Sequence, residues 1–484
     1  MNDKRIKWLK VIGLSVCFGI GVAQLFFALC WAWKNGSNVQ DFYDTGIYFR
    51  DALNMTCDGW RLTGYSCVLR VFMWFESILG DYYIVMLYLF QAIISLLCFT
   101  EGCRSIGKYL FDCSLSFYKL ILPAVYIITL PVIWQMQFAV LPDALCLSLT
   151  ILVLAKLLEC VSRPDKINIY SYFIIGGSVL VIGLMEHHYF YGVICLLAFH
   201  FVILCFRWFK SKFVMKKSLW QATIILLLML CTTFVTDMVN DSVPKTDNYI
   251  SYSLEAELIS RFVYPNLQAD YSFYDESIKA VLPQENAQAT VLYIETYYNE
   301  IGVLMENNYA GNVADLFLYM AKKGASLHAK EIVSGTTKEI LLYTFIPFAM
   351  VKNMYSNGNS LYGHNYTKMY EISPKLTADY MHVGMNGFLC VVIVGIISGL
   401  IQIAVNRKIL PKRVFAILYG LLNVLSVIMP MMILSMMKFD YRIGLFSVYM
   451  WGIYSVGYLY MIFVNKKSKI HTCDVGYEEK SFIK

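Results

Sequence analysis

The sequence predicts an all-α polytopic membrane protein with about ten membrane-spanning helices. Of its 484 residues, 58% are apolar and only 15% are charged, and the mean hydropathy is +0.55. Soluble domains are typically about 45–50% apolar and about 25% charged, so this chain has too little polar surface to cover itself in water. Its apolar runs are continuous rather than alternating, which favours helices over a closed barrel. A soluble enzyme, a disordered scaffold and a nucleic-acid-binding module are therefore excluded.

Hydropathy divides the apolar part of the chain into ten segments of about the 20 residues that a hydrocarbon core requires. The predicted spans are 9–33, 82–100, 119–137, 142–160, 170–185, 189–206, 218–236, 386–405, 414–436 and 443–464. The first run lacks a small-residue cleavage site, so it is expected to remain as a span rather than to act as a signal peptide. No repeat of fixed period is visible, which disfavours an inverted-repeat transporter.

The distribution of Lys and Arg predicts the orientation. Segments on the same side as Met1 are short and hold 24 of the 40 Lys and Arg residues, against 16 on the other side, if Lys10, Lys119 and Lys156 at the adjoining ends of the predicted spans are counted with them. Short loops rich in Lys and Arg stay in the cytoplasm. Both termini are therefore predicted to be cytoplasmic, with the chain in the plasma (inner) membrane. No Lys or Arg is expected within the core of a span.

Four regions follow from this division. They are an N-terminal membrane module of seven spans (1–236), an external domain (237–385), a C-terminal membrane module of three spans (386–464) and a cytoplasmic tail (465–484). The external domain has 17 acidic and 10 basic residues, so it carries −7 whereas the rest of the chain carries +13. We expect it to be mainly helical. Its segment 341–351 is apolar but only 11 residues long, so we expect it on the membrane surface, with a further crossing as the alternative.

The first external loop, 34–81, combines a polar stretch with an apolar segment, 68–79, that is too short to span and is expected to lie at the interface. Cys57 and Cys67 share this loop, and a disulfide between them is left open. Four N-x-Ser/Thr sequons fall on the external side, headed by Asn35, Asn54, Asn240 and Asn365.

Charged and polar residues at the external ends of the spans are the candidates for chemistry. Asp41 and Asp44 are three residues apart, so a helical turn would place both carboxylates on one face, where one could act as a general base. Solvated loop carboxylates are the alternative. Arg61 lies three residues before Gly64, at the turn into the interfacial segment.

Three further groups occupy external turns. Asp143 follows Pro142 at the start of the fourth span, where a carboxylate is stabilised by the helix dipole, and simple capping also explains it. The turn between the fifth and sixth spans contains Glu186, His187 and His188, which could bind a phosphate or merely form a polar hairpin. The last external turn contains Lys438, Asp440 and Arg442, of which Arg442 offers a planar fork suited to phosphate.

Taken together, these segments resemble the polytopic glycosyltransferases of the GT-C fold, in particular family 39 with the protein O-mannosyltransferase and aminoarabinose-transferase-like group. The matching elements are DTGIY at 44–48 followed by DAL at 51–53, RLTGYS at 61–66, LPDAL at 141–145 and DYR at 440–442. They are similar to the family's D-x-x-x-Y loop motif, its R-x-P-G-Y-P element, its (S/T)-E-x-L helix start and its charged Arg/Tyr turn. Thr63 and Ser66 replace the two prolines, Asp143 replaces Glu, and the EHH turn stands where relatives often have Arg.

The resemblance implies a GT-C-like bundle that transfers a sugar from a polyprenyl-phosphate donor to an envelope lipid, glycan or protein acceptor. Asp44, or its neighbour Asp41, would be the general base. Tyr48, Arg61, Asp143, Glu186, His188 and Asp440 would line the site, and Arg442, Lys438 and His187 would stabilise the leaving lipid phosphate. No cofactor and no obligatory metal are expected, and a divalent cation is left open.

Three other readings compete with this one. A lipid-linked glycan polymerase or ligase would use paired external arginines rather than an acid in the first loop. A flippase or transporter of envelope precursors would place charges and broken helices within the spans. A non-catalytic assembly protein would use the external domain to bind a partner.

Overall fold

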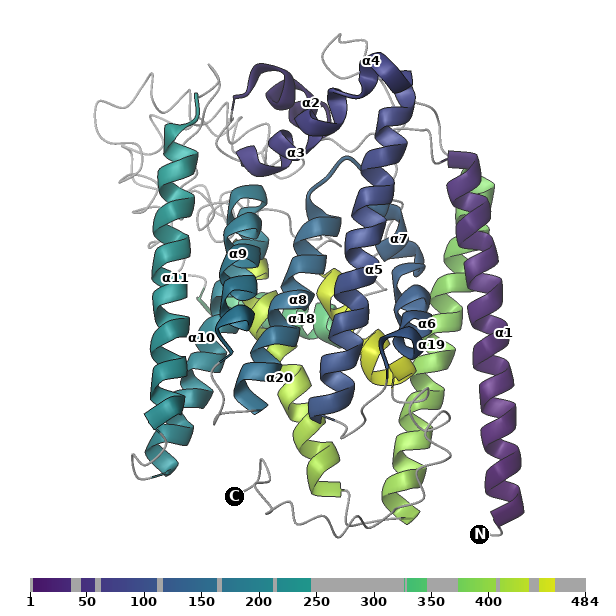
Figure 1. Cartoon of the computed structure of the whole chain (residues 1–484). Helices are drawn as coiled ribbons and strands as arrows, with labels where there is room; N and C mark the ends of the chain where they lie inside the picture. The colour runs from purple at the N-terminus through teal and green to yellow at the C-terminus, as the bar shows by residue number, and fades with distance from the viewer. Residues whose placement is uncertain are drawn as a thin grey trace.

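The structure is a computed structural model that describes residues 3–35, 45–56, 62–110, 116–162, 168–211, 216–244, 326, 329–345, 373–405, 410–434 and 444–457. Every regular element in these ranges is a helix, and the long helices pack side by side in one bundle (Figure 1). Seven of the described helices are long and apolar enough to cross a membrane. The predicted class, an all-α polytopic membrane protein, is therefore confirmed.

The bundle is formed by the segments predicted as spans. Its helices are α1 (Asp3–Asn35), α5 (Tyr83–Leu110), α6 (Phe117–Ile128), α7 (Pro131–Gln137), α8 (Asp143–Ser162), α9 (Ile169–Met185), α10 (His187–Lys210), α11 (Lys216–Ser242), α19 (Pro374–Val405), α20 (Leu410–Leu434) and α21 (Leu445–Gly452), which η7 (Ile453–Gly457) continues as a π-helical turn. The shorter elements are α2 (Thr45–Asn54), α3 (Thr63–Met73), α4 (Glu76–Leu79), the 3-10 turn η1 (Gly80–Tyr82) and α18 (Ala329–Phe345).

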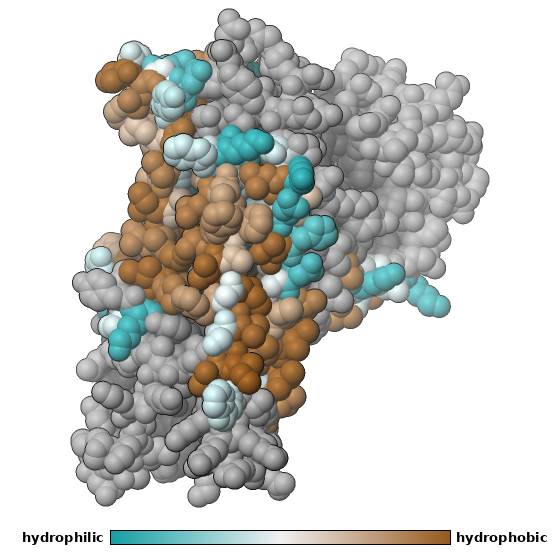
Figure 2. All heavy atoms as spheres, turned by 90° about the vertical axis from the view of Figure 1, so that its right-hand side faces the viewer, coloured by the Kyte–Doolittle hydropathy of each residue, from teal (hydrophilic) through white to brown (hydrophobic). Residues whose placement is uncertain are grey.

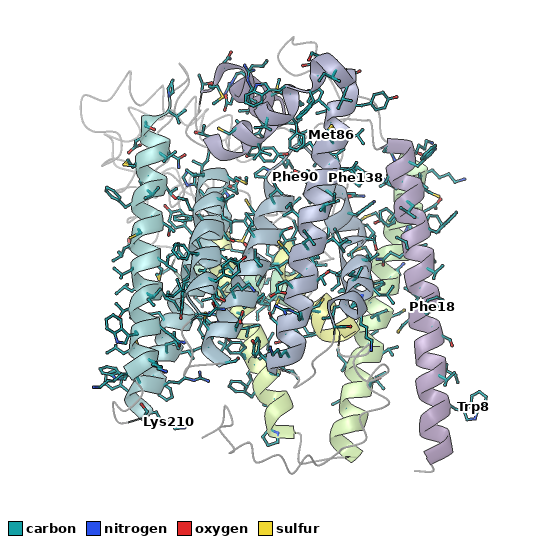
Figure 3. The ribbon with its side chains drawn as sticks, in the orientation of Figure 1. Trp8, Phe18, Met86, Phe90, Phe138 and Lys210 are labelled. Atoms are coloured by element: carbon teal, nitrogen blue, oxygen red, sulfur yellow. The ribbon has the colours of Figure 1, made fainter. Side chains whose placement is uncertain are left out.

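Successive helices run in alternating directions, which gives the bundle two chemically different ends. The end that contains Asn35, Tyr83, Asp143 and Ser242, at the top of Figure 1, is called the upper end here. The elements α2, α3 and α4 lie across it (Figure 1). The opposite, lower end contains the start of α1 and Lys210, which is labelled with Trp8 in Figure 3. The described residues of the first external loop and of the short external turns therefore share the upper end, whereas α18, which the sequence assigned to the external domain, lies within the bundle.

The centre of the bundle is α8, and its periphery includes α1. Of the most apolar window of α8, 78% is buried, against 12% for α1. Side chains of α1 such as Trp8 and Phe18 are exposed and point away from the bundle (Figure 3). Figure 2 shows the side at the right of Figure 1, where the described surface is largely hydrophobic. Such a surface suits contact with lipid rather than water.

The predicted third span, 119–137, is wrong as a single straight helix. It consists of α6 and α7, which meet at an angle of 87°. Pro131 has no backbone N–H and disfavours helical geometry at the residue before it, Leu130, whose ψ is 134°. Lipid cannot satisfy the carbonyl groups that the break frees. Two of them instead accept hydrogen bonds from the side chains of Gln24 and Tyr380, on α1 and α19.

The expectation that segment 341–351 lies on the membrane surface is wrong for its described part. Residues 341–345 end α18, which packs against α20 and α21. Tyr343 and Thr344 are fully buried, and Trp451 donates a hydrogen bond from Nε1 to the carbonyl oxygen of Thr344 at 2.7 Å. The apolar character of the segment is therefore explained by burial between helices. Residues 346–351 lie outside the described part of the chain.

Lys156 corrects the expectation that no Lys or Arg lies within the core of a span. It lies on α8 with its side chain only 11% exposed, and its Nζ is 2.9 Å from Glu101 Oε1 on α5. Glu159 lies 3.7 Å from the same ammonium group, and Arg104 pairs with Glu101 at 2.6 Å. The four charges balance one another, as partly buried charges must. They join α5 to α8 near the lower end.

Candidate active site

The structure describes about half of the residues that the sequence predicted for the site. Tyr48, Asp143, Glu186, His187 and His188 are described. The others lie outside the described residues, and they are Asp41, Asp44, Arg61, Lys438, Asp440 and Arg442. The described part of the site is formed by α2, α3 and the upper ends of α8, α9 and α10.

Tyr48 lies on α2 and is buried against the next helix rather than open to solvent. Its ring packs edge-to-face against that of Tyr65 on α3, with centroids 5.1 Å apart and an interplanar angle of 76°. On the same helix, Asp51 is buried and accepts hydrogen bonds from Arg50 and from the Thr56 hydroxyl. The two helices of the first loop thus form one packed unit, with Tyr48 as part of its core.

Gly64 brings α3 into direct backbone contact with α9. A Cβ at this position would lie 2.6 Å from the carbonyl oxygen of Leu184, so no other residue fits without a shift. Of the two roles open to a glycine at this position, a sharp turn or a close backbone approach, the structure therefore shows the close approach. Because Leu184 is in the last turn of α9, the start of α3 lies beside the turn that leads into α10.

Asp143 opens α8 directly after a proline. The carbonyl oxygen of Pro142 accepts hydrogen bonds from the backbone N–H groups of Leu145 and Cys146, which fixes the first turn. The carboxyl group of Asp143 is almost fully buried, at 2% exposure of the residue. It lies close enough to Tyr65 to act on it electrostatically. Burial, Tyr88 and Asp143 together raise the pKa of Tyr65 well above its ordinary value, so this hydroxyl stays protonated.

Glu186 alone connects α9 to α10, as the predicted tight turn requires. Its backbone is extended, with φ −156° and ψ 118°, between two helical residues. Its Oε1 lies 2.8 Å from Nδ1 of His188, and the ring of His187 stacks on that of Tyr191. Glu186 and Asp143 both act electrostatically on the thiol of Cys146, which places the α9–α10 turn beside the start of α8.

Five of the predicted site residues therefore converge at the upper end, from three separate parts of the sequence. We call the following set the upper cluster: Tyr48, Tyr65, Asp143, Glu186, His187 and His188. The N-terminal ends of α3, α8 and α10 also meet there, and helix N-termini favour anionic groups. The arrangement combines carboxylates and imidazoles for proton transfer with a local field suited to a phosphate. Among the residues that the structure describes, no group of three or more His, Cys, Asp or Glu side chains could hold a metal ion.

Sequence reasoning did not nominate two residues that the structure places at the upper cluster or beside it. Tyr65 was part of the quoted RLTGYS element, so the motif itself was the signal that could have identified it. Gln91 is a fully buried amide on α5 that accepts a hydrogen bond from the Tyr65 hydroxyl at 3.0 Å. A lone Gln within an apolar run was its only sequence signal.

The structure describes Asn35, which heads one of the four sequons, but only one of the two cysteines of the first external loop. Asn35, which heads a sequon, is buried, and its side chain bonds to Trp31 and to the backbone N–H of Ser373. It is therefore inaccessible to a modifying enzyme in this structure. Cys67 is exposed on α3, whereas Cys57 lies outside the described residues, so the question of their pairing stays open.

A cavity of about 260 Å³ lies away from the upper cluster. It is lined by apolar surface from α18, α19, α20, α21 and η7, including Gly395, Val424 and Tyr454. Gly395 is about 32 Å along α19 from Pro374 at the usual rise of 1.5 Å per residue. The cavity is therefore nearer the lower end and is not part of the candidate site.

Comparisons with known proteins add one distant structural likeness. No protein-family model matches the chain, and no curated protein matches it in sequence. Among solved structures, it is similar to ArnT from Cupriavidus metallidurans, crystallised with bound undecaprenyl phosphate. The alignment covers 92% of this chain and 77% of that chain at 11% identity, with a TM-score of 0.30. At this TM-score the likeness assigns neither family nor function, so the family resemblance rests on the sequence motifs.

Proposed function

We propose that this chain is a membrane glycosyltransferase that moves a sugar from a polyprenyl-phosphate donor to an envelope lipid, glycan or protein acceptor. The observation that carries the proposal is the convergence at the upper cluster. The motifs 44–48, 61–66 and 141–145 resemble one family, and the turn 186–188 was predicted for its ionisable side chains at a span end. Their described residues lie together at one end of the bundle, where a lipid phosphate would meet the membrane surface.

The reaction would proceed by inversion at the anomeric carbon. The hydroxyl oxygen of the acceptor forms the new bond to this carbon while the bond from the carbon to the phosphate oxygen breaks, and its electron pair goes to the lipid phosphate. Asp44, with Asp41 as the alternative, takes the proton of the acceptor hydroxyl. For the leaving phosphate we propose stabilisation by the charges of Arg442 and Lys438, by a hydrogen bond from the imidazole of His187, and by the helix N-termini of the upper cluster.

The upper end is proposed to face the outside of the plasma (inner) membrane. Its described helix ends carry acidic residues such as Asp51, Asp143 and Glu186. The lower end carries basic residues from several helices, namely Lys108, Lys119, Lys156, Arg207, Lys210, Lys216 and Lys217. Cytoplasmic ends are the basic ones. Both termini would then be cytoplasmic, as the charge distribution predicts.

A transporter is the second candidate, because the bundle contains one broken span and one charged cluster. The break between α6 and α7 has a structural role, because the side chains of Gln24 and Tyr380 already donate hydrogen bonds to the carbonyl groups there. The cluster around Lys156 is balanced by Glu101, Glu159 and Arg104 and lies away from the upper cluster. Neither feature leaves an evident ion or substrate path among the described residues.

Substitution of the two first-loop acids tests the catalytic assignment. Asp44→Asn and Asp41→Asn remove the proton acceptor but keep the side-chain size, and loss of a general base typically costs about 10²–10⁴-fold in rate. Sugar transfer is measured in membranes that contain equal amounts of correctly inserted protein, with Asp81→Asn, an exposed acid in η1, as the control. If both first-loop variants keep full transfer, the assignment of the base is wrong.

A further inference from the structure

Gln91 is the centre of a buried hydrogen-bond network under the first external loop. Its Oε1 accepts a hydrogen bond from the hydroxyl of Tyr65 on α3 at 3.0 Å. Its Nε2 donates to the carbonyl oxygens of Gln137 and Ala139, at 3.0 and 3.1 Å, in the link from α7 to α8. Gln91 is completely buried, and both amide N–H groups and the amide oxygen have partners. One side chain thus joins the first loop to two other elements.

The network continues from Gln91 toward the start of α8. One turn further along α5, Ser95 donates to Gln137 Oε1 at 3.0 Å, and its Oγ is 2.6 Å from Oγ of Ser148. Ser148 in turn donates to the carbonyl oxygen of Ala144, the residue that follows Asp143. The single hydroxyl hydrogen of Ser148 is shared between Ser95 and the Ala144 carbonyl, so these polar contacts lead from Tyr65 through α5 and α7 to the first turn of α8. They hold the two sides of the upper cluster in a fixed register.

This network depends on each member because it is buried at membrane depth. An amide or hydroxyl group that loses its partner there cannot recruit bulk water, so the remaining groups must move or stay unsatisfied. The Tyr65 hydroxyl stays protonated at all physiological pH values, because burial and the Asp143 carboxylate raise its pKa, and it remains a donor to Gln91. Tyr48 packs against the other side of this ring.

We propose that Gln91 is a positioning residue for sugar transfer, which sets the distance between the first external loop and the Asp143 end of α8 through Tyr65. The inference rests on the proposed function, because it names a residue that acts on that same site. Gln91 does not touch substrate in this account. It determines where the loop that carries Asp41 and Asp44 begins its contact with the bundle.

A double-mutant cycle with a matched control tests the proposal. Gln91→Leu and Tyr65→Phe each remove one side of the bond, and Gln24→Leu removes an equally buried glutamine that bonds to Tyr126 and Thr129 on α6. We expect kcat to fall at least ten-fold in Gln91→Leu and in Tyr65→Phe, with KM for the donor changed less than three-fold. The double variant should be no slower than the slower single variant. Gln24→Leu should keep kcat within three-fold of the wild-type value, compared at a thermal stability equal to that of Gln91→Leu.

Two outcomes would overturn the positioning role. In one, Gln91→Leu and Gln24→Leu lower kcat equally per folded protein, which is what a general structural role predicts. In the other, the effects of Gln91→Leu and Tyr65→Phe multiply, which means that the two residues act independently.

A distance measurement separates this proposal from the proposed function. Spin labels at Cys67 on α3 and at Met238→Cys on α11 occupy exposed positions. We expect their distance distribution to broaden or shift in Gln91→Leu but not in Gln24→Leu. If the wild-type chain transfers no sugar, the proposed function fails while the distances still decide the structural part. If transfer is present and the distances do not change in Gln91→Leu, the positioning role is wrong.

Discussion

Asp143 is the described residue whose environment is most unusual for its chemistry. It is a carboxyl group at 2% exposure, at the first position of α8 and within electrostatic reach of Tyr65, and both it and Glu186 act electrostatically on the Cys146 thiol. The helix dipole stabilises it there by about 0.3–1 kcal/mol. That stabilisation accounts for an acid at a helix start, but not for its burial.

We predict that Asp143→Asn lowers sugar transfer by about 10²-fold while the protein remains folded, because small misplacements at a reacting centre cost this much. The neutral amide keeps the shape of the side chain but removes the charge that faces Tyr65. Transfer is measured at saturating donor, with thermal unfolding in detergent as the check on folding. Full activity in the variant would mean that Asp143 serves only as a helix cap.

At the level of elements, the contact between α3 and α9 depends on one glycine. Gly64→Ala would place a methyl group 2.6 Å from the Leu184 carbonyl oxygen, whereas nothing lies within 4 Å of a Cβ at Gly177 on α9. We predict that Gly64→Ala destabilises the protein by about 1–3 kcal/mol, the usual cost of overpacking. Gly177→Ala should be neutral or stabilising by up to about 1 kcal/mol. Thermal unfolding compares the two, and equal effects would contradict the close approach of α3.

The docking of α18 inside the bundle makes a second prediction at this scale. Trp451→Phe keeps an aromatic ring but removes the donor to the Thr344 carbonyl oxygen. Leaving a buried carbonyl without its partner costs about 1–3 kcal/mol. Trp220, which is 62% exposed on α11, provides the control Trp220→Phe. A lower unfolding temperature for Trp451→Phe alone supports this packing, and identical temperatures for the two variants argue against it.

The sequence predicted elements better than the bends and contacts between them. Length and hydropathy identify a helix such as α8, because burial in lipid or protein requires the same apolar composition. The break before Pro131 was missed because a proline near a span end is compatible with a straight helix until the partners of its free carbonyls are known. The burial of Tyr343 and Thr344 was missed because an 11-residue apolar segment suits a membrane surface and a helix interface equally.

The residues of the candidate site also differ in how far the sequence could predict them. Asp143, Glu186, His187 and His188 could be nominated from charge at span ends, since ionisable groups near the membrane are rarely accidental. Gln91 could not, because its importance comes from contacts with residues 26 and 46 positions away, such as Tyr65 and Gln137. A pattern in one sequence does not specify which distant carbonyl a buried amide meets.

For the whole molecule, we predict that the upper end of the bundle faces the outside of the cell. Asp81→Cys in η1 and Lys216→Cys at the start of α11 are exposed at opposite ends. In a chain whose Cys57 and Cys67 are replaced by serine, a membrane-impermeant maleimide should label Asp81→Cys in intact cells. Lys216→Cys should react only after the membrane is permeabilised. The reverse pattern would place the upper cluster in the cytoplasm and contradict the proposed orientation.

The central claim is that the bundle transfers a sugar rather than moving a lipid across the bilayer. The most direct measurement reconstitutes the full chain in vesicles with a polyprenyl-phosphate sugar and follows two products, free polyprenyl phosphate and donor that has changed leaflet. We predict acceptor-dependent release of polyprenyl phosphate that is lost in the Asp41→Asn/Asp44→Asn double variant. Movement of intact donor between leaflets without release, at the same rate in wild type and variant, would contradict the account.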